Sequence, residues 1–489
     1  MIRSAVRSLS LAMVLPAIAL PAVLLAQAPN HQSHFPPEEF RARWARIYEQ
    51  IGDRAVAIVQ GVSLTRGFAL PRQSNEFYYL SGVETPGAYL LLDGRTRKAT
   101  ILLPPRNERL ERNEGKVLSA EDVDLVRQLT GADLVASTRS MGEDWLNELV
   151  KAPAPAIYTL FSPAEGSAES RGELHNANAA IAADYWDGRP SREAHFVGLL
   201  RTRAPRADVR DLTAILDEMR SVKSAREIAL IRRASQLAGL GILEAIKSTR
   251  AGLFEYQLDA AARYMFLAGG ARLEGYRSIT AAGTANIWNG HYYRNTAQLK
   301  DGDLLLMDFA PDYGYYTSDV TRMWPINGRY SPVQRELLQV VLEYRNVVLN
   351  LTRPGLTTRA ILEQARVVME PVLQRTKFSK PVYEQAARKM VETGGGVFSH
   401  PVGLAVHDDG PYNRDVLKPG HVFSIDPQLW VPEESLYIRY EDVIVITADG
   451  YENFTEFLPS ELNELEKLVG QGGVGLRLQP AAGKDLLRR

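Results

Sequence analysis

Cysteine is absent from the 489 residues of the chain. Without cysteine the protein has no disulfide framework and no cysteine that could carry a lipid anchor. A chain that needs no oxidation to fold also fits an exported protein. At this length the chain holds two domains or one large α/β domain, so a single small module is excluded.

The chain also lacks an excess of positive or negative charge. The formal net charge is −1 and 24% of the residues are charged, with no long block of like charges. Such a balance provides no basic surface for nucleic acid and no cationic patch for an anionic membrane. We therefore expect a small or peptidic partner and no nucleic acid.

Long apolar runs are confined to the N-terminus. Two arginines precede an apolar run from Leu9 to Leu25, and Ala26-Gln27-Ala28 follows it. A basic start, an apolar centre and an Ala-x-Ala site are typical of a secretory signal peptide, here residues 1–28. The alternative is an uncleaved membrane anchor, but two prolines interrupt the run. We predict a periplasmic or secreted protein that begins near Pro29 and has no stable membrane insertion after cleavage.

Residues 36–205 have the pattern of a mixed α/β N-terminal domain. Bulky apolar residues recur on one helical face at its start, and short strand-like runs bounded by glycine, proline and aspartate follow. The predicted strands are RAVAIVQG, NEFYYLSGV, AYLLLDG and KATILLPP, and the predicted helices are PPEEFRARWARIYEQ, DVDLVRQL and MGEDWLNELV. The Pro-rich stretch KAPAPAIY is interpreted as a loop inside this domain.

Residues 206–469 have the pattern of a second, α+β domain. Ser224 with Glu227, and Ser331 with Gln334, form capping boxes that start helices. A strand hairpin is expected at 302–326, and further strands begin at Val422 and run over 435–447. Strands and helices that lack a βαβ rhythm favour antiparallel pairs over a doubly wound sheet. The glycine-rich residues 470–489 are predicted to form a disordered tail.

The predicted hairpin MDFAPDYGYYTSDVTR carries one acid on each strand. A turn centred on Tyr313-Gly314 places Asp308 directly opposite Asp319. Like charges that face each other on a sheet destabilise it, by up to about 1 kcal/mol at the surface and by more when buried. Each aspartate alone is more often a turn residue. The opposed pair is better explained by a cation between the carboxylates, or by one carboxylate that stays protonated.

Two histidines lie in GGGVFSHPVGLAVHDDG, residues 394–410. Pro401 argues against a helix here, so His400 and His407 do not share a helical face. Taken alone, each is more often a surface residue or a hydrogen-bonded core residue. The glycine run does not indicate a phosphate loop, because no Lys-Ser/Thr pair follows it. A further histidine, His291, lies among aromatic residues in NIWNGHYYRN.

Polar residues also interrupt the apolar strands near the C-terminus. In LYIRYEDVIVIT, Arg439 and Glu441 are two positions apart and project from the same face. Either a salt bridge within the strand or a metal-binding carboxylate oriented by a guanidinium explains this pair. In VFSIDPQLW, Asp426 precedes a proline, which by itself favours an extended turn residue.

Taken together, these positions supply one histidine and four carboxylates, with two histidines to spare. Oxygen ligands suit Mn, Mg or Ca, and one imidazole shifts the preference towards Mn, Fe, Co or Zn. Two divalent ions about 3.5–4 Å apart, bridged by carboxylates, would explain why so many acids converge.

Five segments together resemble the pita-bread metallopeptidases, and specifically those of the aminopeptidase P (Xaa-Pro aminopeptidase) type. The segments are PRQSNEFYYLSGVETPGAYLLL, SVKSAREIALIRRA, HYYRNTAQLKDGDLLLMDFAPDYGYYTSDVTR, SHPVGLAVHD and IRYEDVIVIT. They match in order and spacing, and the resemblance extends from about residue 36 to about residue 468. It implies an aminopeptidase P-like N-terminal domain followed by a pita-bread catalytic domain.

The resemblance also implies roles for single residues. It makes Asp308 a ligand of one metal, Asp319 and Glu441 bridging ligands, and His400 a ligand of the other metal. His291 and His407 fall on the catalytic histidines of the family, and Arg439 falls on the arginine that orients its ligands.

One ligand position departs from the family pattern. The fifth ligand is usually Glu in EPG, whereas this chain has Asp426 in DPQ. Since Asp is one methylene shorter, we expect weaker binding of the metal on the His400 side. The segment between Asp426 and Arg439 is also short for the family, so the rim of the substrate pocket is expected to differ.

The function implied is hydrolysis of the bond between an N-terminal residue and a following proline, by attack of a hydroxide that bridges two metals. The resemblance favours Mn²⁺, with Co²⁺ or Zn²⁺ as alternatives, and a homodimer or larger. Two other functions stay open, a prolidase that cleaves only Xaa-Pro dipeptides and a catalytically inactive pita-bread binding protein. A metal-free creatinase-like hydrolase would not need the aspartate pair.

Overall fold

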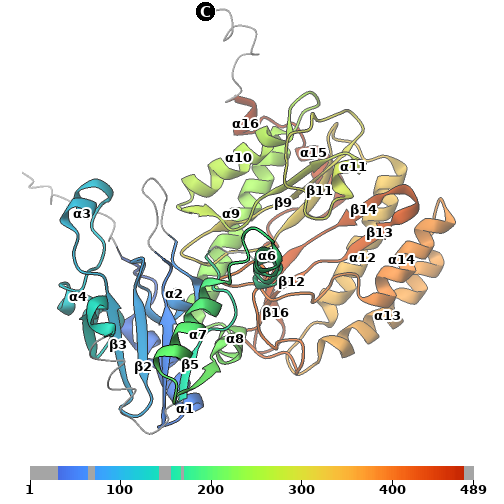
Figure 1. Ribbon diagram of the computed structural model, residues 1–489. Coiled ribbons are helices and arrows are strands. Elements are labelled where there is room, and N and C mark those ends of the chain that lie inside the picture. The colour runs from blue at the N-terminus through green and yellow to red at the C-terminus, as the bar shows by residue number, and fades with distance from the viewer. Residues whose placement is uncertain (1–30, 64–71, 143–155, 167–169, 478–489) are drawn as a thin grey trace, which may run out of the picture.

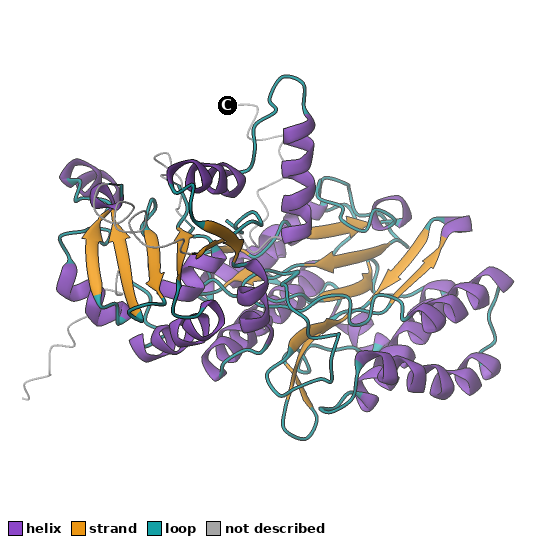
Figure 2. Cartoon of the chain, turned by 60° about the horizontal axis from the view of Figure 1, so that its bottom comes forward, coloured by secondary structure: helices purple, strands orange, loops and turns teal. Residues whose placement is uncertain are grey.

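The computed structural model describes residues 31–63, 72–142, 156–166 and 170–477. The chain forms two domains side by side, an N-terminal one and a larger C-terminal one (Figure 1). The predicted signal peptide and nearly all of the helix predicted at MGEDWLNELV lie outside the described residues. In Figure 2 the strands of each domain form a central layer with helices packed outside it.

A six-stranded sheet forms the centre of the N-terminal domain, in the order β4-β3-β2-β1-β5-β6. Its strands are β1 (Ala55–Gln60), β2 (Tyr89–Asp93), β3 (Lys98–Leu103), β4 (Leu134–Ser137), β5 (Ala156–Thr159) and β6 (Asp208–Asp211). The helices around it are α1 (Pro37–Ile51), α2 (Asn75–Ser81), α3 (Glu108–Glu114), α4 (Val123–Thr130), α6 (Arg171–Ala183) and α7 (Arg192–Arg203). The last strand, β6, comes from residues beyond the predicted boundary at 205.

One predicted strand of this domain is wrong, because NEFYYLSGV contains helix α2. All seven residues of α2 are buried, so neither the helical nor the strand period shows in the sequence. The helix ends at Gly82 in the left-handed conformation. Two side chains of α1 bind the free carbonyls of its last turn, Trp44 Nε1 to Leu80 O at 2.8 Å and Arg43 Nη1 to Tyr79 O at 2.5 Å.

The C-terminal domain contains four small antiparallel sheets among the described residues, with helices around them. The sheets have the orders β11-β9-β8, β12-β15-β16 and β13-β14, and β7 pairs with β10. The strands are β7 (Leu273–Glu274), β8 (Ile279–Ala282), β9 (Leu304–Asp308), β10 (Pro311–Asp312), β11 (Thr321–Pro325), β12 (Val422–Ile425), β13 (Gln428–Val431), β14 (Leu436–Arg439), β15 (Asp442–Ile446) and β16 (Tyr451–Asn453). This arrangement confirms the predicted α+β organisation with antiparallel pairs.

Two helices of this domain begin at the capping boxes that the sequence predicts. Both capping boxes are present, with Ser224 at the start of α9 and Ser331 at the start of α12. The helices are α8 (Thr213–Ser221), α9 (Ala225–Ser248), α10 (Glu255–Ala268), α11 (Thr284–Ile287), α12 (Pro332–Leu351), α13 (Thr358–Arg375), α14 (Pro381–Thr393), α15 (Leu462–Leu468) and α16 (Val474–Arg477). Among the helices that the structure describes, none is both long enough and apolar enough to cross a membrane.

The hairpin that carries the two aspartates has a different register from the predicted one. Its two-residue turn is centred on Gly314-Tyr315, which both have positive φ, at 60° and 74°. Asp308 therefore faces Thr321 across the ladder, not Asp319. Tyr315 keeps this unfavourable conformation because its ring stacks on Tyr78 of the N-terminal domain, at 3.5 Å between ring centroids.

The strand predicted over 435–447 is two strands that belong to different sheets. β14 pairs with β13, whereas β15 pairs with β12 and β16. At the crossing point, Glu441 forms a short antiparallel bridge with Thr321, its N–H donating to Thr321 O at 3.2 Å. The crossing brings Glu441 next to the start of β11 and so to the aspartate hairpin.

Part of the predicted tail is described by the structure. α16 lies against α9, where the N–H of Gly475 donates to Ser248 Oγ at 3.0 Å. Residues 478–489 of this predicted tail lie outside the described residues.

Candidate active site

Three buried carboxylates converge at the junction of the small sheets. Asp308 ends β9, Asp319 precedes β11 and Glu441 lies between β14 and β15. One oxygen from each lies within 4.8 Å of the others. The two aspartates are diagonal neighbours on one face of the hairpin, and the hydroxyl of Tyr276 donates to both, at 2.5 Å and 2.9 Å. The altered register therefore keeps the predicted pair together.

His400 completes one side of this carboxylate cluster. Its Nδ1 lies 3.1 Å from Pro401 O, and a proton donated there leaves a lone pair on Nε2. Nε2 faces Asp319 Oδ2 at 3.6 Å and Glu441 Oε1 at 4.0 Å. Burial, followed by the neighbouring His407, lowers the pKa of His400 well below its usual range, which favours the neutral ligand form.

The other two predicted histidines lie beside His400. The rings of His400 and His407 are 4.1 Å apart between centroids, and those of His291 and His407 are 6.2 Å apart. Burial and then the charge of Arg439 lower the pKa of His407 to about 4. His407 is therefore neutral near pH 7 and can donate or accept a hydrogen bond.

The guanidinium of Arg439 pairs with three carboxylates of the site. It donates from Nη1 to Asp308 Oδ2 at 2.7 Å, from Nη2 to Glu441 Oε2 at 2.6 Å and from Nε to Asp426 Oδ1 at 2.8 Å. All three ion pairs are buried. Arg439 and Glu441 therefore lie together as predicted. The guanidinium also bonds Asp308 and Asp426.

Asp426 lies beside the cluster, on the same guanidinium as two of its carboxylates. Its Oδ1 accepts from Arg439, and its Oδ2 accepts from Gln428 Nε2 at 2.5 Å. It belongs to neither of the two groups whose ligand atoms converge, Asp308 with Asp319 and Glu441, or Asp319 with His400 and His407. Both oxygens of the shorter side chain thus accept hydrogen bonds from Arg439 and Gln428.

The residues present fit divalent metal ions. Glu441 Oε1 is buried and has no hydrogen-bond partner, although it points towards His400 and Asp319. Burial and the neighbouring carboxylates raise the pKa values of Asp319 and Glu441 well above their usual range. Four carboxylates against the single guanidinium of Arg439 leave an excess of buried negative charge, which two divalent cations would neutralise.

Two family models match the chain. Metallopeptidase family M24 matches residues 229–448, and Aminopeptidase P, N-terminal domain, matches residues 40–158. The carboxylate cluster lies within the part of the chain that matches metallopeptidase family M24.

Proteins similar to this chain match it over most of its length. The Xaa-Pro aminopeptidase of Escherichia coli is 29% identical over 458 residues, which cover 88% of this chain and 97% of that protein. A proline aminopeptidase P II from Yersinia pestis superposes with a TM-score of 0.70 at 27% identity, covering 89% of this chain and 99% of the other. A zinc-substituted Escherichia coli aminopeptidase P in complex with product superposes with a TM-score of 0.70 at 26% identity, over 89% and 98%. The predicted pita-bread domain behind an aminopeptidase P-like domain is thereby confirmed.

Three residues that touch the ligands of this site were not predicted. Tyr276 bonds both aspartates, Thr321 Oγ1 donates to Glu441 Oε2 at 2.9 Å, and Gln428 bonds Asp426. Tyr276 and Thr321 stand in ordinary apolar or mixed stretches, so nothing in the sequence pattern marks them. Gln428 was visible as a departure from the EPG motif.

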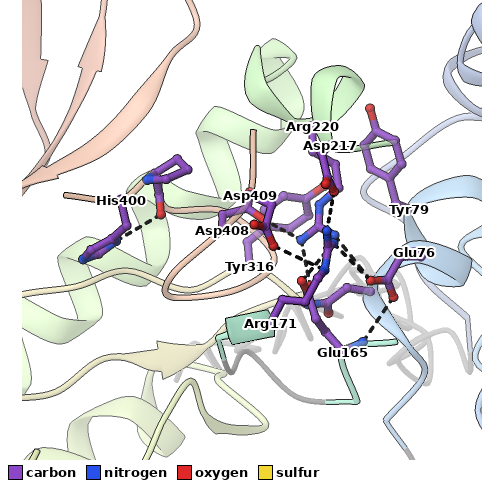
Figure 3. A network of polar contacts seen from close by, with 12 residues as sticks. Glu76, Tyr79, Glu165, Arg171, Asp217, Arg220, Tyr316, His400, Asp408 and Asp409 are labelled. Carbon is purple, nitrogen blue, oxygen red and sulfur yellow. Dashed lines mark hydrogen bonds and ion pairs between the residues drawn. The ribbon is translucent and has the colours of Figure 1, made fainter. Parts of the chain in front are cut away.

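The site is tied to the N-terminal domain through the residue that follows His407. Arg220 of α8 bonds both Asp408 and Glu165, the latter at 2.8 Å (Figure 3). Lys223 lies 3.1 Å from Asp408. Arg171, at the start of α6, reaches Glu165 at 3.1 Å and Glu76 at 3.4 Å. This buried network joins the histidine loop to α2, to α6 and to the segment after β5.

Proposed function

We propose that the protein is a metal-dependent Xaa-Pro aminopeptidase, which hydrolyses the bond between an N-terminal residue and a following proline. One observation carries the proposal, the convergence of Asp308, Asp319 and Glu441, with an unpartnered Glu441 oxygen, beside the neutral His400. The match of residues 229–448 to metallopeptidase family M24 and the similarity to Xaa-Pro aminopeptidases over both domains support it.

Five residues would hold two divalent ions. Asp308 would bind one ion, Asp319 and Glu441 would bridge the pair, and His400 would bind the other. Asp426 would join that second ion only after giving up its bond to Gln428 or to Arg439, so we expect this ion to bind more weakly. We propose Mn²⁺ as the native metal, with Co²⁺ or Zn²⁺ as alternatives.

The ions, when bound, supply a water that is acidic enough to act as a nucleophile near neutral pH, together with positive charge at the scissile carbonyl. His291 and His407 lie on the open side of the cluster and would hydrogen-bond the substrate and the oxyanion that develops. His407 is neutral because of its lowered pKa, so it adds no charge repulsion towards the metals. Glu441 or a histidine would pass the proton to the departing proline nitrogen.

The choice of substrate follows from the chemistry of proline. An Xaa-Pro bond has no N–H, so peptidases that read the substrate backbone as a strand lose a hydrogen bond at this position. Because general aminopeptidases handle such bonds poorly, a dedicated enzyme has a clear role.

The assay that tests this function compares substrates of different length. The mature protein is dialysed against chelator, reloaded with Mn²⁺ and given an Xaa-Pro dipeptide, an Xaa-Pro-Yaa tripeptide and a longer Xaa-Pro peptide, with products identified by mass spectrometry. Release of the first residue from the tripeptide and the longer peptide supports the proposal. Cleavage of the dipeptide alone indicates a prolidase. No metal-dependent cleavage of any peptide indicates a binding protein.

We also propose export and self-association. The N-terminal pattern of residues 1–28 supports transport to the periplasm or to the medium, and fractionation of cells with an antibody to the protein tests it. The family resemblance supports a homodimer or larger assembly, which light scattering on the mature protein tests.

A further inference from the structure

His291 lies on a segment that has little regular structure of its own. All of residues 283–297 are described, and they contain the four-residue helix α11 and no strand. The imidazole of His291 is exposed to solvent. Its position at the site therefore depends on what holds the segment beneath it.

One buried carboxylate, that of Glu255, bonds this segment and the residue before it at four points. Glu255 is the first residue of α10 and is 0% exposed. Its Oε1 accepts from the N–H of Ala282 at 2.6 Å and from Asn286 Nδ2 at 3.0 Å. Its Oε2 accepts from the hydroxyl of Tyr292 at 2.9 Å and from the N–H of Ala297 at 2.8 Å. The two N–H donors lie at the ends of the segment, and the two side-chain donors lie within it.

A carboxylate suits these four donors better than a neutral side chain does. Each of its oxygens accepts two hydrogen bonds here, whereas an amide has one acceptor oxygen and two N–H donors. The N–H of Ala297 cannot turn away from such a donor, because the two backbones are paired and Glu255 N–H donates to Ala297 O at 3.0 Å. The start of α10 also favours negative charge, since the N-terminus of a helix carries partial positive charge.

One of the four bonds anchors the residue next to the imidazole. Tyr292 follows His291 directly and is only 9% exposed, so its hydroxyl bond to Glu255 fixes the chain beside His291. The other three bonds fix the segment on either side. None of the four involves a proposed metal ligand. The imidazole held in this way lies 6.2 Å from that of His407 between ring centroids.

We propose that Glu255 is a positioning residue for the hydrolytic reaction, which holds residues 283–297 so that His291 meets the substrate beside the carboxylate cluster. The inference rests on the proposed Xaa-Pro aminopeptidase function, in which His291 hydrogen-bonds the substrate or the oxyanion. It gives a role in the reaction to a carboxylate that lies outside the set of metal ligands and acts through another residue.

The test replaces Glu255 by glutamine and measures kcat/KM on an Xaa-Pro-Yaa tripeptide after reloading with Mn²⁺. We expect Glu255→Gln to lose about ten- to a hundredfold, the scale of a small displacement of a reacting group. Its calorimetric affinity for Mn²⁺ should be unchanged, because all proposed ligands are intact. Tyr292→Phe, which removes one of the four bonds, should lose less. Asp122→Asn is the matched control in the N-terminal domain, because Asp122 also accepts a backbone N–H, from Ser119 at 3.0 Å, and it should leave kcat/KM unchanged.

A double-mutant cycle separates positioning from general damage to the fold. If Glu255 acts through His291, Glu255→Gln costs little further activity in a His291→Ala background. Residues that act independently lose the same factor in both backgrounds, and that result would overturn the proposal. Unchanged activity in Glu255→Gln, or weakened Mn²⁺ binding, would overturn it as well.

Amide hydrogen exchange supplies a measurement that needs no activity. Exchange over residues 283–297 is compared with exchange in α13 for the wild-type protein and for Glu255→Gln. We expect the substitution to speed exchange over 283–297 and to leave α13 unchanged. This comparison decides if His291→Ala retains too little activity for the cycle. If the wild-type protein cleaves no peptide, the proposed function fails, and faster exchange confined to 283–297 still supports the hold of Glu255 on the segment. Equal exchange, or faster exchange in both regions, overturns it.

Discussion

Arg439 Nη1 donates to Asp308 Oδ2 at 2.7 Å, although 131 positions separate the two residues. The same guanidinium bonds Glu441 and Asp426, so one buried cation compensates three of the four carboxylates at the site. The site therefore depends on positive charge from two sources, Arg439 and the metals.

Replacing Arg439 by methionine should expose that dependence. Removing one partner of a buried ion pair costs about 3–5 kcal/mol, because the remaining charges lose their compensation. We expect Arg439→Met to lower the stability of the chelated protein by this order, and Mn²⁺ to restore part of the loss. Urea unfolding with and without Mn²⁺ measures both effects. An equal loss under the two conditions would contradict the coupling.

Lengthening Asp426 should strengthen the second metal site. Asp426→Glu combined with Gln428→Gly adds the missing methylene and removes the amide that holds the carboxylate outside the cluster. We expect this variant to bind the weaker Mn²⁺ about tenfold more tightly than wild type in calorimetric titrations. Asp449→Glu, at an exposed position, serves as the control for the substitution itself. Unchanged affinity would show that Asp426 already binds as well as glutamate.

The buried network around Arg220 should contribute strongly to stability. Arg220→Met leaves Asp408 and Glu165 buried with weaker compensation, so we expect a loss of about 3–5 kcal/mol in urea unfolding. Arg210→Met is the matched control, since the pair of Arg210 with Asp208 is exposed to solvent and its loss should change stability little. Similar losses in the two variants would rule out a special role for the network.

His421 should make stability depend on pH. Burial and the nearby Lys223 and Lys418 lower its pKa to about 4 in the folded protein, below the ordinary value of 6.5. The unfolded chain therefore takes up this proton at higher pH than the folded one, so stability falls as pH drops from about 6.5 to 4. His421→Asn keeps an acceptor and cannot be protonated, and it should reduce the fall by about 2 kcal/mol. Unfolding curves of both proteins at pH 7 and pH 4.5 test this, and parallel losses would contradict it.

The sequence predicts elements whose signals are local. The capping boxes at Ser224 and Ser331 mark their helices because both partners lie within one turn. The predicted register of the hairpin was wrong because Tyr315 adopts a positive φ. The tertiary contact of Tyr315 with Tyr78 explains that conformation. Helix α2 shows no apolar period in the sequence because all seven of its residues are buried.

The candidate site is predictable as far as its residue types and motifs extend. The carboxylates interrupt apolar segments of the sequence, but each residue alone has a commoner explanation, so the roles of the carboxylates and of the histidines came from the resemblance to the family. The hydrogen bonds from Tyr276 and Thr321 depend on how the small sheets meet, and no pattern in the chain announces them. The crossing at Glu441 between two sheets is likewise a property of the assembled fold.

The most direct test of metal-dependent hydrolysis compares substitutions at two aspartates of the same hairpin. Asp308→Asn removes a proposed metal ligand, whereas Asp312→Asn alters a buried aspartate of the same hairpin that pairs with Arg72. Release of the first residue from an Xaa-Pro-Yaa tripeptide is measured for both variants after reloading with Mn²⁺. We predict that folded Asp308→Asn loses at least about a hundredfold in kcat/KM, of the scale set by losing a metal-activated nucleophile, while Asp312→Asn stays within about threefold of wild type. Full activity in Asp308→Asn would contradict the metal-dependent mechanism.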